Sequence, residues 1–280
     1  MTRRGTTLLE LVVAVAVSGM VVVAALAVQR SLDQTSRARA ERAGAAANLR
    51  AAAGIFSFEL GAVGIDSVAG PDLMSLGPSG VSFRAQRGLW LVCRLAADSI
   101  VVAAGRLERW RRRGLEVGRD SLLVYVAGDT AAEIDGWVPA PLLAGPTSSA
   151  CPSGEPGLRF RTAIDTGAAA AGRLVVPTVA RAFESVALAT YGSAGIWQLG
   201  ETGLSAGGTV QPVVGPLDGS AGVWLAGWDR LGGAPGRLDL TAGVDLWVRA
   251  LARREVAVGP GRVAVARDSV LVRIGFEGVP

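Results

Sequence analysis

The chain lacks two residue types on which many catalytic and binding sites depend. None of its 280 residues is histidine, so neither a Ser-His-Asp nor a Cys-His nucleophile can be assembled, and the commonest zinc ligand is missing. All 28 basic residues are arginine, which excludes a lysine Schiff base and a phosphate-binding loop that ends in Gly-Lys-Ser/Thr. The acidic residues show no spacing typical of a paired-carboxylate hydrolase. We therefore expect a protein that is not an enzyme and that holds no cofactor and no metal.

Charge is also scarce, whereas glycine is abundant. Charged residues make up 19% of the chain and the net charge is only +4. This balance is weak support for nucleic acid, because proteins that bind it concentrate positive charge on one face. The 38 glycines and the 50% apolar content favour a β-rich domain with tight turns and a substantial core over a helical bundle.

The longest apolar run lies near the N-terminus. Residues 11–28 contain no charged side chain, and a run of this length is about what a helix needs to cross the hydrocarbon of a bilayer. Arg3 and Arg4 precede the run, so the positive-inside rule predicts a cytoplasmic leader and an extracytoplasmic remainder. Glu10 borders the run, and a carboxylate in lipid is costly unless a positive group partners it.

The sequence around Glu10 resembles a known processing signal. Gly5 is followed by Thr-Thr-Leu-Leu-Glu-Leu-Val-Val-Ala, which is similar to the N-terminal signal of type IV pilins and type II secretion pseudopilins. The resemblance implies that a prepilin peptidase cuts after Gly5 and that the new N-terminal residue, Thr6, is N-methylated. It also implies that Glu10 pairs with the N-terminal amine of a neighbouring subunit. The family usually has Phe directly after the cut, where this chain has Thr6.

Two other interpretations of this region stay open. Glu10 is explained equally by a position at the membrane edge, where its carboxylate would reach the headgroups. Ala25-Leu26-Ala27 fits the small-x-small site of ordinary signal peptidase, and a cut there would release a soluble extracytoplasmic binding module. Against that cut, the apolar run is long for a signal core, and a glutamate at its start has no use in a disposable peptide.

The segment after the apolar run predicts that the helix continues outward. Residues 29–63 contain no proline and are rich in alanine and arginine, which favour helix. An apolar stripe at helical spacing runs along this segment at Ala43, Ala46, Leu49, Ala53, Phe56, Leu60 and Val63. A continuous helix from Thr6 to residue 63 would be about 85 Å long.

The remainder of the chain is typical of short strands separated by turns. Gly- and Pro-containing breaks are expected at 64–80, 139–157 and 203–222. The expected strands are residues 81–85, 89–95, 100–104, 107–110, 122–127, 158–164, 186–191, 196–199, 223–228, 244–251 and 270–276. The predicted fold class is α+β, with the long N-terminal helix packed on an antiparallel β-rich domain. The expected divisions are a leader at 1–5, a membrane-spanning helix at 6–28, its amphipathic continuation at 29–63, and an extracytoplasmic domain at 64–280.

Two cysteines and several aromatic residues complete the candidates in the extracytoplasmic domain. An even cysteine count outside the cytoplasm suggests a disulfide between Cys93 and Cys151, and buried thiols are the alternative. We expect the tryptophans to fill the core or a subunit contact rather than a ligand pocket. Those considered are Trp197, Trp224, Trp228 and Trp247.

Two charged clusters are candidate binding sites. A basic run beside an aromatic can grip single-stranded DNA, but it more often forms a solvated strand edge. This run comprises Arg106, Arg109, Arg111, Arg112 and Arg113 around Trp110. The acidic residues Asp129, Glu133 and Asp135 do not match the spacing of a calcium loop, so solvated loop charges are expected there.

The resemblance implies a function in filament assembly. The order of features in the large domain is most like that of a minor pilin or minor pseudopilin. The expected partners are other pilin or pseudopilin subunits, the prepilin peptidase, an inner-membrane assembly platform and the lipid bilayer, and DNA is not expected. The implied location is the bacterial inner membrane, by a single pass with the domain outside, and then a periplasmic or surface filament. The competing class is a secreted or singly anchored binding module.

Overall fold

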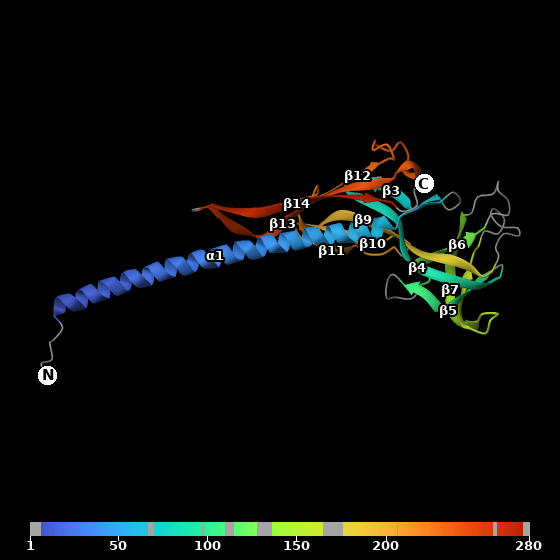
Figure 1. Cartoon of the computed structure of the whole chain (residues 1–280), viewed down its shortest axis with the longest axis horizontal. Coiled ribbons are helices and arrows are strands. Elements are labelled where there is room, and N and C mark those ends of the chain that lie inside the picture. Colours follow the sequence, from blue (N-terminus) through green and yellow to red (C-terminus); the bar gives the residue numbers. More distant parts are fainter. Residues whose placement is uncertain are drawn as a thin grey trace.

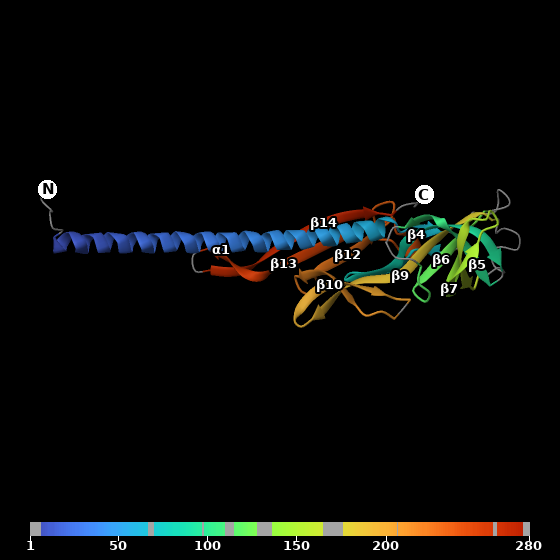
Figure 2. The same ribbon diagram turned by 90° about the horizontal axis from the view of Figure 1, so that it is seen from below.

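A computed structural model of the chain shows one long helix attached to a large antiparallel sheet (Figure 1), which confirms the α+β prediction. The helix lies along the long axis of the molecule, and the strands gather around its C-terminal half and beyond its end (Figure 1 and Figure 2). The structure describes residues 7–66, 70–96, 98–109, 115–127, 136–164, 176–205, 207–259 and 262–276.

Helix α1 (Leu8–Gly61) has 54 residues and is therefore roughly 80 Å long. It begins two residues later than expected, because Thr7 has an extended backbone and caps the helix. The buried stripe also differs in part from the prediction. Leu49, Phe56 and Leu60 are buried as expected. The other small positions on the buried face are Ala38, Ala45 and Ala52, whereas Ala43 is exposed.

The strands follow α1 and pair antiparallel throughout. A short 3₁₀ helix, η1 (Leu238–Leu240), interrupts them. Their bounds are β1 (Ile65–Asp66), β2 (Gly70–Pro71), β3 (Leu73–Gly77), β4 (Gly80–Ala96), β5 (Ser99–Arg109), β6 (Asp120–Val126), β7 (Gly136–Ala150), β8 (Pro156–Thr162), β9 (Thr178–Ser193), β10 (Ile196–Gly203), β11 (Gln211–Leu217), β12 (Val223–Trp228), β13 (Gly243–Gly259) and β14 (Arg262–Gly275).

We call the part that packs on the helix the proximal module. It consists of the C-terminal half of α1, strands β3 and β10 to β14, residues 80–84 of β4 and residues 185–193 of β9. The stripe of α1 packs on the inner face of this sheet, chiefly on β13 and β14. Phe56, Leu60, Phe83, Leu199 and Leu246 are almost wholly buried in this core. The hairpin of β13 and β14 runs back along α1 toward its N-terminal half (Figure 1).

The second part, the distal barrel, has its own core. It consists of strands β5 to β8 with residues 85–96 of β4 and 178–184 of β9. The strands close in the order β4-β5-β8-β7-β6-β9, because β9 pairs with β6 on one edge and with β4 on the other. Ala180, for example, is opposite Val124 of β6 and Trp90 of β4. Trp90, Ile100, Leu122 and Phe160 fill the interior, so the barrel is a packed core rather than a channel.

Several strand predictions were wrong in extent. The two strands predicted at 81–85 and 89–95 form one continuous strand, β4, and those at 100–104 and 107–110 are joined in β5. The predicted break at 139–157 contains most of β7, and the predicted break at 203–222 contains β11. The strand predicted at 223–228 coincides with β12.

Candidate functional site

The N-terminal half of α1 is long and apolar enough to cross a membrane, and the most apolar eighteen-residue window of the helix is 0% buried. A signal sequence would pass the same test of length and composition. The buried core helix of a soluble protein would also pass it, but its apolar surface would be covered. Here burial along α1 begins only at Ala38. The large side chains exposed before that point include Leu8, Leu11, Val15, Val17, Met20, Val23, Leu26 and Val28.

Glu10 lies at the start of this bare surface and is tied to the helix N-terminus. The backbone N–H of Thr7 donates to Glu10 Oε2 at 3.0 Å, and the Glu10 N–H donates to Thr7 Oγ1 at 3.3 Å. This reciprocal capping box satisfies two backbone donors at the helix start. Its signal in the sequence is the spacing Thr-x-x-Glu from Thr7 to Glu10. Gly5 and Thr6, the predicted processing residues, lie outside the described residues.

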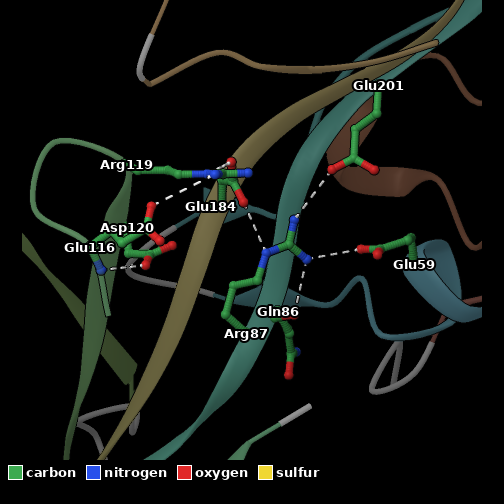
Figure 3. Close-up of polar contacts among 8 residues, drawn as sticks. All are labelled: Glu59, Gln86, Arg87, Glu116, Arg119, Asp120, Glu184 and Glu201. Carbon is green, nitrogen blue, oxygen red and sulfur yellow. Dashed lines mark hydrogen bonds and ion pairs between the residues drawn. The ribbon is translucent and has the colours of Figure 1, made fainter. Parts of the chain in front are cut away.

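The end of α1 is held by a buried arginine where the two modules meet (Figure 3). Arg87 of β4 donates to Glu59 of α1 and to Glu184 of β9, both at 3.1 Å. The third carboxylate, that of Glu201 in β10, lies 4.0 Å from Arg87 Nη2. Arg119, before β6, also donates to Glu184. We call this group the Arg87 cluster; it comprises Glu59, Arg87, Arg119, Glu184 and Glu201. The cluster joins α1, the long strands β4 and β9, and the barrel. No local pattern in the sequence predicts it.

Opposing effects act on the buried Glu184 carboxyl. Its burial opposes ionisation. The hydrogen bonds and positive charges of Arg119 and Arg87 outweigh that effect, so the pKa of Glu184 is lowered. The ionised form is therefore the stable form in the folded protein, as expected for a carboxylate that accepts hydrogen bonds from two guanidinium groups.

A second buried carboxylate ties the chain just after α1 to the sheet. Asp72 accepts a hydrogen bond from the Gly64 N–H at 3.0 Å and one from Arg181 Nη2 at 2.9 Å. Burial raises the pKa of Asp72, although Arg181, the Gly64 N–H and Arg84 all favour its ionised form. Asp72 and the Arg87 cluster together fix how the helix leaves the sheet.

Cys93 and Cys151 form a disulfide that joins β4 to the end of β7 in the distal barrel. Their Cα atoms are 5.5 Å apart, and 58 residues separate them in the sequence. A closed loop of this length stabilises the folded state by about 4 kcal/mol in the chain-entropy model. The disulfide therefore braces the barrel far from α1.

The two charged clusters gain no support as ligand sites. Trp110, Arg111, Arg112 and Arg113 lie outside the described residues, and Arg106 and Arg109 are placed only as members of β5. The acidic residues Asp129, Glu133 and Asp135 also lie outside. Within the part of the chain that the structure describes, no group of three or more histidine, cysteine or acidic residues is arranged to hold a metal.

The tryptophans divide between core and surface. Trp90 is buried in the barrel. Trp224 and Trp247 face each other across β12 and β13, and both are partly exposed on the side of the sheet away from the core. Arg249 stacks over the Trp247 ring and Arg273 over the Trp228 ring, at 5.5 and 5.3 Å. Exposed tryptophan and arginine side chains of this kind are enriched in protein interfaces.

No family model, no curated protein and no solved structure matches the chain. Function must therefore be inferred from the residues and their geometry.

Proposed function

We propose that the chain is a minor structural subunit of a type IV pilus-like filament, either a pilus or a secretion pseudopilus. The observation that carries the proposal is the division of α1. Its C-terminal half is packed on a folded domain, while its apolar N-terminal half is uncovered. An uncovered apolar helix of this length needs lipid or other apolar helices around it. The pilin-like signal Gly5-Thr6 and the carboxylate of Glu10 stand directly before it.

In this function the bare half of α1 has two successive environments. The subunit is first held in the inner membrane by that half, with its domain outside. After the cut at Gly5, the helix leaves the bilayer and packs against the helices of other subunits. The carboxylate of Glu10 then meets the α-amine of Thr6 in a neighbour, and each removes the cost of burying the other in an apolar environment.

The mature N-terminus tests the proposal directly. Intact-mass analysis of membrane-extracted protein should show a chain that begins at Thr6 and carries one methyl group. Replacing Gly5 by a bulky residue should leave the precursor uncut, because the peptidase reads a small residue there. A chain that begins at Val28 would overturn the proposal in favour of a secreted binding module released by signal peptidase.

The carboxylate of Glu10 tests the assembly step separately from processing. Glu10→Val should insert and be cut after Gly5, but it should accumulate in the membrane and be depleted from sheared filaments. Asp33→Asn is the matched control, because it also removes an acidic charge from the exposed surface of α1. Equal filament content for Glu10→Val and wild type would mean that Glu10 serves only as an anchor at the membrane edge and has no role in assembly.

A further inference from the structure

A rigid loop presents one apolar side chain to solvent at the end of the proximal module. Leu231, between β12 and η1, is 96% exposed. Its loop is held by Asp229, whose Oδ1 accepts hydrogen bonds from the Leu231 and Gly233 N–H groups, both at 2.9 Å. The Asp229 N–H donates to the Gly233 carbonyl at 2.8 Å, and Gly232 adopts a positive φ of 81°. A preordered loop loses little conformational entropy when it binds.

An apolar cleft lies elsewhere in the same module. It has a volume of about 660 Å³, which is within the range of pockets that bind ligands. One wall comes from the start of β10 and from β11, and the other comes from the hairpin of β13 and β14. Its apolar lining includes Ile196, Trp197, Pro212, Pro216, Leu251 and Val265. Ile196 is 47% exposed and Val265 is 37% exposed, so the lining is accessible from outside.

The loop lies beside the start of β13, and the cleft lies beside the middle of that strand. Trp228, which leads into the loop, is opposite Gly243 at the start of β13, and the cleft is lined by Leu251 farther along. Eight residues of strand separate these points, or roughly 26 Å. The hairpin continues from Leu251 along α1 in the direction of the helix N-terminus, and the Arg254 N–H donates to Glu41 near the middle of the helix. The cleft therefore lies closer to the bare half of α1 than the loop does.

Charge beside the two features is complementary. Arg230 is exposed next to Leu231, and its side chain makes no hydrogen bond or ion pair with the described residues. Glu255 is exposed opposite Val265 in the hairpin and is likewise unpaired among those residues. Arg249 and Arg267, two arginines of the hairpin, are held by Asp218 at 4.0 and 3.7 Å, and Arg254 is exposed next to Glu255. An incoming Arg230 would meet an available carboxylate at the cleft.

We propose that the Leu231 loop of one subunit enters the cleft of a second copy of this chain. Because the loop and the cleft are different surfaces, the contact is heterologous and repeats in one direction instead of closing into a dimer. Two copies with parallel α1 helices, displaced along the helix axis, bring a loop toward a cleft. The proposal rests on the proposed function for its direction. The subunit nearer the membrane then offers Leu231 to the cleft of the subunit that precedes it outward.

Cysteine cross-linking of the full-length chain in membranes tests the contact. Both native cysteines are already paired, so added cysteines report alone. Two differently tagged copies, one with Leu231→Cys and the other with Val265→Cys, should form a covalent dimer that carries both tags under mild oxidation. Val179→Cys in the barrel is the control for Val265→Cys, because the two native side chains are 40% and 37% exposed. It should give no dimer with Leu231→Cys.

The double variant separates a directional contact from a symmetric one. A chain that carries both Leu231→Cys and Val265→Cys should form a ladder of trimers and longer products. A product that stops at dimers, a Leu231–Leu231 dimer as the main species, or equal cross-linking to Val179→Cys would overturn the proposal. Cross-linking of Leu231→Cys to a different protein in place of the second copy would overturn it too.

Charge reversal tests whether Arg230 of one copy pairs with Glu255 of the other. Arg230→Glu in the first copy, or Glu255→Arg in the second, should lower the cross-link yield about two- to fivefold, the range of one exposed ion pair. Combining the two changes should restore it. If filaments contain the chain but no cross-link forms, the contact is wrong and the filament function stands. If cross-links form on a chain that begins at Val28, the filament function is wrong and the contact is self-association of a secreted domain.

Discussion

The two halves of α1 share one backbone conformation but have opposite environments. In the first half, residues 11–28 are apolar on all sides and uncovered. The second half has one apolar stripe, buried from Ala38 to Leu60, and exposes arginines on its other faces. Helical hydrogen bonding is the same in both, so it does not decide where each half resides. The distribution of apolar side chains around the helix decides, because a one-sided stripe suits a folded domain and an all-round surface suits lipid or other helices.

The largest effect should come from the buried stripe. Phe56→Ala should lower the stability of the domain by about 3–5 kcal/mol, because it leaves a cavity where the helix packs on the sheet. Phe58→Ala, two residues along the same helix, is the matched control, since Phe58 is exposed and Phe56 is buried. Thermal or denaturant unfolding of the domain measures both. Similar losses for the two variants would mean that the stripe does not anchor the helix.

An added charge in the bare half of α1 should weaken membrane insertion, and a substitution there should leave no cavity in the folded domain. Met20→Arg should cost about 2.5–3.5 kcal/mol of membrane insertion, the value for arginine at the centre of a spanning helix, because Met20 is exposed at the middle of the apolar run 11–28. The melting temperature of the folded domain should not change, because Met20 contacts none of its core. Fractionation into membrane and soluble pools, together with the melting curve, checks both statements. A drop in the domain's melting temperature would contradict the conclusion that the first half of α1 does not contribute to the stability of the domain.

A substitution in the last turn of α1 should have a smaller effect on the stability of the domain. Glu59→Leu should cost about 1–3 kcal/mol, because it removes one hydrogen-bond acceptor from the buried Arg87 guanidinium. Glu184 continues to pair with Arg87, which limits the loss. Arg50→Leu, a change at an exposed charged position in the same half of α1, is the control and should be near neutral. An unfolding midpoint for Glu59→Leu equal to that of Arg50→Leu would show that the Arg87 cluster does not hold the helix.

The smallest effect concerns pH. The pKa of Glu184 is lowered in the folded state, so its stabilising contribution is fully present above the unfolded value of about 4.3. It is lost as the pH falls through the folded value. The stability difference between wild type and Glu184→Gln should therefore shrink in acid. Asp72, whose pKa is raised, acts in the opposite sense, so the difference between the variants is the quantity to follow. A difference that stays constant to pH 3 would contradict the assignment.

The sequence predicted the parts of the molecule that local pattern controls. The length of α1, the continuation beyond the apolar run and the bounds of β12 follow from helical or alternating apolar spacing. Strand β7 was missed because it contains Pro139 and Pro141. Both prolines occupy exposed positions between the buried Val138, Ala140 and Leu142, in the part of β7 that pairs only with β6. Proline is tolerated at a free edge because the N–H it lacks is not needed there.

The Arg87 cluster could not be predicted in the same way. Arg87 and Glu184 are 97 residues apart in the sequence, and each looks like an ordinary charge on a strand. What brings them together is the pairing of β4 with β9 over most of their length. Local periodicity carries no information on such pairing, and the closure of the barrel depends on the same register. The exposure of Leu231 could not be predicted either, because a lone leucine in a turn gives no periodic signal.

The two strands shared by the modules determine how force passes through the molecule. Strands β4 and β9 both run from the proximal module into the barrel without interruption. Tension that pulls the barrel away from α1 therefore stretches two covalent backbones side by side, and no noncovalent interface between the modules has to resist it alone. The β4–β9 hydrogen bonds are not sheared, because both strands are drawn in the same direction. Under traction the barrel should stay attached until the proximal sheet itself gives way.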